Sequence, residues 1–207
     1  MTVDRFFEEV FTMRSSRHFS TYDIVIVGVM AALCFVTTAF LKIGPIPTPA
    51  GPTMLKVGNI VCLLSGLLFG GIRGGLSAGI GSALYDLTDP VFAASAPFTL
   101  LFFFLMSFVC GLIAHWNGRK GTDTKWNIIG AVSGAGTYLV LHIGKSLITL
   151  LLAGSGFSAA IAACGIQLIT SGFNAVFAVV VSVLLAPVFR AALLRAGFGQ
   201  KLFPSRN

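Results

Sequence analysis

The sequence predicts an all-α membrane protein, a six-transmembrane-helix bundle whose N- and C-termini both lie in the cytoplasm. Of its 207 residues, 56% are hydrophobic and only 10% are charged, whereas soluble domains carry about 25% charged residues. Only short connections interrupt the apolar content, which indicates a single membrane domain at residues 24–190. A cytoplasmic segment, residues 1–23, precedes this domain, and a basic cytoplasmic tail, residues 191–207, follows it.

The six predicted helices are apolar stretches separated by polar or proline-rich connections. A membrane-spanning helix needs about 20 predominantly apolar residues. The second and third stretches are short and rich in glycine, which is tolerated where neighbouring helices cover the backbone. The six stretches are residues 24–43, 57–72, 74–88, 97–116, 127–152 and 160–187.

Residues 1–23 predict an amphipathic helix rather than a signal peptide, because they hold seven charged side chains and no continuous apolar run. Their apolar residues follow helical spacing and are Val3, Phe6, Phe7, Val10 and Phe11. Such a helix would lie along the membrane surface. Docking against a partner protein is the alternative.

The positive charges predict the orientation. Eleven of the fourteen Lys and Arg residues fall in segments that are cytoplasmic if the N-terminus is inside, as the positive-inside rule requires. Lys42 and Lys56 would lie outside, and Lys145 lies within a span. The sequence therefore predicts a multi-pass protein of the cell membrane.

The predicted outer connections differ from the basic inner ones. The first, GPIPTPAGPTM at residues 44–54, contains four prolines and no charge, which is typical of a stiff loop. The second contains TDP at residues 88–90, and the third is GSGFSA at residues 154–159. These loops would either cover a pocket or serve simply as tight connections.

Small residues predict close helix packing. Glycines repeat at four-residue spacing, which lets the backbones of membrane helices approach each other. The three series are Gly66, Gly70 and Gly74; Gly71, Gly75 and Gly79; and Gly130 and Gly134. Gly28 and Ala32 share one face of the first helix, which would serve either internal packing or a partner protein. The four cysteines lie in apolar runs without metal-ligand spacing, so they predict packing residues and no metal site.

Lys145 is the polar residue that most needs an explanation, since a charge near the bilayer centre costs about 2.5–3.5 kcal/mol. Lys145, His142 and Tyr138 lie on one helix face and form a polar stripe in the outer half of the fifth span. Such a stripe predicts an outward-facing polar pocket. Two alternatives are that Lys145 snorkels to the outer headgroups or forms an ion pair with Asp86 or Asp89.

Further polar residues fall near the same side of the membrane. They are Gln167 and Asn174 in the sixth span, Asn59 in the second, and Tyr85 and Asp86 in the third. Because a pore should be lined along its whole length, clustering at one side predicts a site for a small polar molecule. For Asn59 and Asn174, hydrogen bonding between helices is the alternative.

Two other function classes stay open at this point. A membrane enzyme would need a reactive cluster, for which His142 and Asp86 are the only pair, and no catalytic or nucleotide-binding motif is present. A channel or autonomous secondary carrier for a small polar solute would move that solute without partners. We therefore expect no catalytic residue and no cofactor in this chain.

Two longer stretches resemble the substrate-binding S component of energy-coupling factor (ECF) transporters. They are TMLKVGNIVCLLSGLLFGGIRGGLSAGIGSALYDLTDP at residues 53–90 and APFTLLFFFLMSFVCGLIA at residues 96–114. The resemblance implies a six-helix bundle that binds a vitamin near the outer membrane face. It also implies a membrane scaffold (T) subunit as partner, with Gly28 and Ala32 at that interface, and two cytoplasmic ATPases that use ATP.

The resemblance also bears on the ligand. It implies a small heteroaromatic vitamin or precursor, such as a pyrimidine precursor of thiamine, vitamin B6, a queuosine precursor or a riboflavin-like ligand, on which Phe98, Phe102, Tyr85 and Tyr138 could stack. The sequence departs from many relatives at FTLLFFFLM, residues 98–106, where a basic residue is expected and none occurs. Either Lys145 takes over the role of that residue, or the ligand differs.

Overall fold

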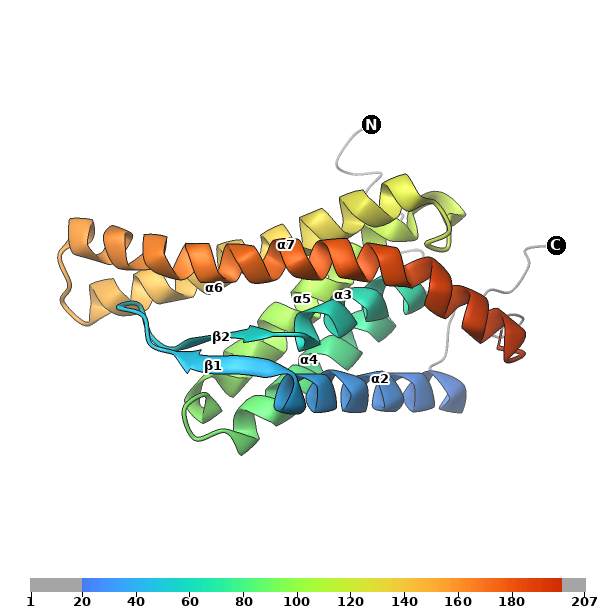
Figure 1. The fold of residues 1–207 in the computed structure, drawn as a ribbon, viewed down its shortest axis with the longest axis horizontal. Coiled ribbons are helices and arrows are strands. Elements are labelled where there is room, and N and C mark those ends of the chain that lie inside the picture. Colours follow the sequence, from blue (N-terminus) through green and yellow to red (C-terminus); the bar gives the residue numbers. More distant parts are fainter. Residues whose placement is uncertain (1–19, 199–207) are drawn as a thin grey trace.

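The computed structural model describes residues 20–198, and six helices form most of this part of the chain (Figure 1). They are α2 (Thr21–Phe40), α3 (Gly58–Phe69), α4 (Gly71–Thr88), α5 (Ala96–Ala114), α6 (Thr124–Leu152) and α7 (Phe157–Arg195). Each coincides with one predicted apolar stretch, although α7 continues past Pro187 to Arg195. The predicted amphipathic helix and most of the C-terminal tail lie outside the described residues.

Within residues 20–198, four helices are long and apolar enough to cross a membrane, namely α2, α5 with its preceding turn, α6 and α7. The helix α3 is apolar but has only 12 residues, and α4 carries many glycine and polar residues. The helical membrane architecture is therefore confirmed. Six crossings and cytoplasmic termini remain predictions.

A β-hairpin forms where a stiff loop was predicted, at residues 44–54. Strands β1 (Lys42–Ile46) and β2 (Thr53–Lys56) pair antiparallel, with Lys42 opposite Lys56. The register shifts between Ile43 and Ile46, where Pro45 cannot donate a hydrogen bond to the partner strand. The prolines predicted a stiff connection, but not its pairing.

The connections that matter for the site gather at one end of the bundle. Figure 1 shows the hairpin, the α4–α5 connection and the α6–α7 turn on the same side, with the start of α2 and the end of α7 toward the other. The helices α6 and α7 run side by side as a long pair and extend furthest toward the hairpin end. Residues from all these segments can therefore meet in one place.

Glycine allows α3, α4 and α5 to pack closely, as predicted. A Cβ added at Gly74 would lie 2.6 Å from the Cα of Gly66, and one at Gly66 would lie 2.5 Å from the carbonyl oxygen of Ser107. Gly70 joins α3 to α4 with a φ of +85°, which a side chain would disfavour. The core beside these contacts consists of large buried side chains such as Leu63, Leu67, Phe103 and Met106, together with buried free cysteines.

Polar contacts fasten the opposite end of the bundle. Arg190 of α7 donates hydrogen bonds to the carbonyl groups of Gly121 and Leu67, and Asn127 donates to the same Gly121 oxygen at 2.8 Å. Arg73 of α4 forms a 2.8 Å ion pair with Asp23 of α2. These contacts hold the helix ends in position at the end of the bundle opposite the hairpin.

Candidate functional site

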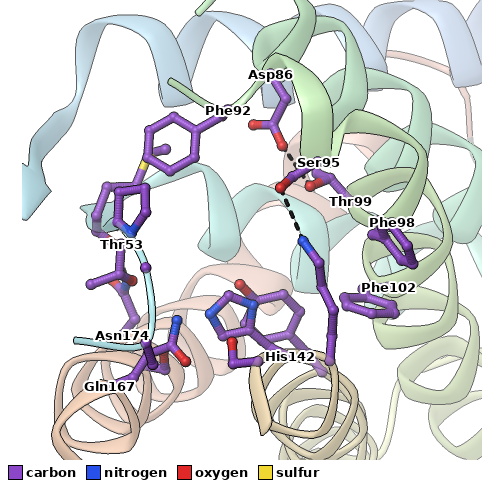
Figure 2. Close-up of a pocket in the computed structure, with 18 of the residues that line it drawn as sticks. Thr53, Asp86, Phe92, Ser95, Phe98, Thr99, Phe102, His142, Gln167 and Asn174 are labelled. Carbon is purple, nitrogen blue, oxygen red and sulfur yellow. Dashed lines mark hydrogen bonds between the residues drawn. The ribbon is translucent and has the colours of Figure 1, made fainter. Parts of the chain in front are cut away.

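A cavity of about 240 Å³ lies at the hairpin end of the bundle, enclosed by β2 and its preceding loop, the α4–α5 region, α6 and α7 (Figure 2). Seven of the nine side chains predicted for a polar pocket line it. They are Lys145, His142, Tyr138, Gln167, Asn174, Asp86 and Phe98. The first two predicted outer connections also contribute lining residues, among them Thr53 and Phe92.

Aromatic rings form one wall of the cavity. The ring of Tyr138 stacks on the imidazole of His142, with centroids 5.3 Å apart and planes 10° from parallel. The centroids of Phe103 and Tyr138 are 4.8 Å apart with the ring planes tilted by 46°, and the ammonium of Lys56 lies 4.3 Å from the Phe103 centroid. Since flat rings stack favourably on aromatic side chains, this wall suits a flat ligand.

Lys145 reaches across from α6 to the α4–α5 region. Its ammonium donates a 2.9 Å hydrogen bond to the Ser95 hydroxyl and lies 4.7 Å from the centroid of the Phe98 ring. It forms neither of the ion pairs given as alternatives: Asp89 pairs with Lys42, and Asp86 accepts a hydrogen bond from Thr99. Figure 2 draws the hydrogen bond from Lys145 to Ser95 as a dashed line.

Three buried polar atoms of the lining have no hydrogen-bond partner among residues 20–198. They are Asp86 Oδ1, His142 Nε2 and Gln167 Oε1. More than 90% of buried polar groups in proteins are hydrogen-bonded, so three exceptions around one cavity indicate a site for hydrogen bonds to a bound molecule or to water. His142 and Asp86 both line the cavity, and no hydrogen bond joins them in the described residues.

Asn174 fastens the hairpin to α7. Its side-chain amide accepts a hydrogen bond from the backbone N–H of Lys56 at 3.2 Å and donates one to the carbonyl of Met54 at 2.7 Å. These two bonds satisfy the backbone edge of β2, much as another strand would. Asn174 therefore positions the strand that carries Lys56 as well as lining the cavity.

Two of the predicted site residues do not line this cavity. Asn59 is buried in the first turn of α3. Tyr85 belongs to a cluster in which Lys42 donates to its hydroxyl, its hydroxyl donates to Asp89 at 2.7 Å, and Lys42 pairs with Asp89 at 2.9 Å. This cluster ties β1 to the end of α4 beside the cavity.

Residues 18–191 match the family described as the ECF-type riboflavin transporter, S component. The chain belongs to this family. It is thus a substrate-binding subunit of an ECF-type vitamin transporter, a multi-pass protein of the plasma membrane that contributes binding rather than catalysis. As a member of this family, the chain associates with a T subunit and with ATPase subunits.

This S component resembles a Pyrococcus woesei protein described as an uncharacterized protein in the gap 3′ region, with 31% identity over 121 residues. That stretch is 58% of this chain and 74% of the relative. No solved structure matches the chain.

The sequence did not single out several lining residues of this S component. The sequence places Lys56 in an outer connection, because it does not predict the hairpin that turns this residue toward the cavity. Phe103 is one of 19 phenylalanines, and nothing in the sequence separates it from those that face lipid. Ser95 and Thr99 flank the start of α5, where their proximity to Lys145 and Asp86 depends on tertiary packing.

Proposed function

We propose that this S component binds a small heteroaromatic vitamin or precursor in the cavity, such as a pyrimidine precursor of thiamine or vitamin B6. The observation that carries the proposal is the combination of an aromatic wall with three unpartnered polar atoms around one cavity. A flat ring would lie against Tyr138 and Phe103, while Asp86, His142 and Gln167 would bond to its polar edge. Lys145 would add a charged donor for an oxygen or an anionic group.

Cavity size supports a compact ligand. Pockets for drug-sized ligands measure about 300–1,000 Å³, and this one measures about 240 Å³. Riboflavin is the second candidate, because the matching family is described by that vitamin. Its three fused rings and sugar-alcohol chain would need the hairpin to move outward, whereas a single ring would not.

Import would depend on partner subunits. We propose that the T subunit docks on the α2 face that carries Gly28 and Ala32, both of which are exposed, and that two cytoplasmic ATPases hydrolyse ATP for transport. The chain itself would use no cofactor.

Mass spectrometry of small molecules released from the purified, denatured protein tests the ligand. We expect a heteroaromatic vitamin or precursor, which rebinds to the emptied protein at one site per chain. Release of no such molecule, together with no binding of pyridoxine, a thiamine pyrimidine or riboflavin at millimolar concentration, would contradict the proposal. Turnover or autonomous uptake by the chain alone in liposomes would favour an enzyme or a carrier instead.

A further inference from the structure

Lys56 is a buried ammonium group that lines the cavity and forms no ion pair in the described part of the chain. The residue is 9% exposed, and its Nζ contacts the face of Phe103. Among residues 20–198 the ion pairs are Lys42–Asp89 and Arg73–Asp23, and no hydrogen bond from the Lys56 ammonium is present. Burying a charge costs more free energy than one cation–π contact returns. Within the described residues Asp86 attracts the Lys56 ammonium without forming an ion pair or a hydrogen bond with it.

The charges of the lining do not balance. Its charged side chains are Lys56, Lys145 and Asp86, so two ammonium groups face one carboxylate. With His142 neutral, the cavity carries an excess of one positive charge. Both ammonium groups act electrostatically on Asp86 and on His142, which places all four around the same space. An anionic group in that space would neutralise the excess positive charge.

We propose that Lys56 and Lys145 form a subsite for one anionic group, so that the ligand is a heteroaromatic monoanion such as a ring carboxylate. The inference rests on the proposed function and narrows its substrate class. The contact of Lys56 with Phe103 places the charge beside the aromatic wall, as a ring with a directly attached anionic group requires. Asp86 limits the subsite to one negative charge, because it would repel a second.

Matched pairs of probes test the proposal with the purified full-length chain. Calorimetry would compare nicotinate with nicotinamide, and 4-pyridoxate with pyridoxine, each pair differing in one negative charge. We expect the anion of any pair that binds to bind at least tenfold more tightly. Pyridoxine 5′-phosphate, with nearly two negative charges, should bind more weakly than 4-pyridoxate.

The Lys56→Met variant tests whether the preference for the anionic probe depends on Lys56. It should reduce the ratio of anion to neutral affinity at least fivefold, because the anion loses a charged partner that the neutral probe does not use. Lys42→Met is the control, because Lys42 lies on the same hairpin but outside the cavity lining; it should leave the ratio unchanged. An unchanged ratio in Lys56→Met would overturn the proposal.

Thermal unfolding of the ligand-free protein separates a binding role from a structural one. Lys56→Met should unfold at the same or a higher temperature than the wild type, since it removes a buried charge that is held by no ion pair among the described residues. A clearly lower temperature would make Lys56 a structural residue and overturn the proposal. Tighter binding of the neutral probes would also overturn it but leave the proposed function standing, whereas release and binding of no heteroaromatic molecule would contradict the proposed function.

Discussion

Lys145 shows how a single costly side chain can indicate a site. A snorkelling lysine would direct its ammonium toward water and headgroups. Instead, the ammonium of Lys145 bonds to Ser95 and lies against Phe98, at the edge of a cavity that His142 also lines. The sequence-based pocket hypothesis agrees with this placement, although contact with a ligand stays a prediction.

Lys145→Ala should weaken ligand binding at least tenfold and leave the fold intact. A hydrogen bond to a charged group contributes about 1.5–3 kcal/mol, and removing it also leaves the ligand's acceptor without a donor. Lys125→Ala is the control, because Lys125 is exposed at the start of α6, at the other end of the bundle. Calorimetric titration measures both, and equal affinities for wild type and Lys145→Ala would exclude a binding role.

Two buried amides on α7 should respond in opposite ways to the same substitution. Gln167→Leu removes an unpartnered Oε1 atom from the cavity wall, so unfolding temperature should hold or rise while ligand affinity falls. Asn174→Leu removes the bonds that hold β2, so we expect a loss of about 1–3 kcal/mol in stability. Thermal unfolding with and without ligand distinguishes them, and destabilisation by both substitutions would assign Gln167 a structural role.

At the scale of elements, helices were easier to predict than the hairpin. The lengths of the apolar stretches, together with the glycines at close helix crossings, predicted the positions of α2 to α7 to within a few residues at most ends. The hairpin depends on contacts that are distant in sequence: Asn174 bonds to β2, and Asp89 pairs with Lys42 of β1. Because Lys56 enters the cavity only through this pairing, the subsite that it forms could not be inferred from local sequence.

The ion pair between Lys42 and Asp89 should stabilise the closed hairpin in a pH-dependent way. Hydrogen bonds from Tyr85 and then Lys42 hold the pKa of Asp89 below its usual range. A carboxyl whose pKa is depressed by folding stabilises the protein above its unfolded pKa, about 3.9, and loses this effect as pH falls through the folded value. The pair is partly exposed, so its contribution should be about 0.2–1 kcal/mol.

Asp89→Asn tests this contribution. The variant should unfold at a slightly lower temperature than the wild type at pH 7 and release ligand faster, since β1 is held less firmly over the cavity. The difference in unfolding temperature should shrink as the pH falls below about 4, where the wild-type carboxyl also becomes neutral. A difference that persists undiminished at pH 3 would show that the ion pair is not its source.

At the scale of the whole molecule, the structure leaves an apolar exterior around a polar cavity at one end. Exposed side chains such as Val29, Leu33, Phe173 and Val176 cover the long helices, as a lipid-facing surface requires. The sequence predicted this division because apolar residues fill the spans and the costly polar groups fall toward one end. It could not show which apolar face meets lipid and which meets a protein, since both surfaces have the same composition.

Gly28 should mark the face that meets the T subunit. It is exposed on α2, and no neighbouring atom lies within 4 Å of the position that a Cβ would occupy. Gly28→Leu should therefore fold and bind ligand normally, because nothing within the chain opposes the larger side chain. In an assembled transporter it should prevent close helix contact with the T subunit, reducing co-purification and ATP-dependent uptake at least tenfold.

Gly165→Leu provides the matched control, since Gly165 is also exposed on a helix with no neighbouring atom within 4 Å. It lies on α7 rather than α2, so the same substitution there should leave assembly and uptake unchanged. Equal effects of the two substitutions would mean that added bulk disturbs the protein in lipid wherever it is placed. Assembly and uptake that survive Gly28→Leu would move the partner interface to another face, because a leucine at a close helix crossing separates the two backbones.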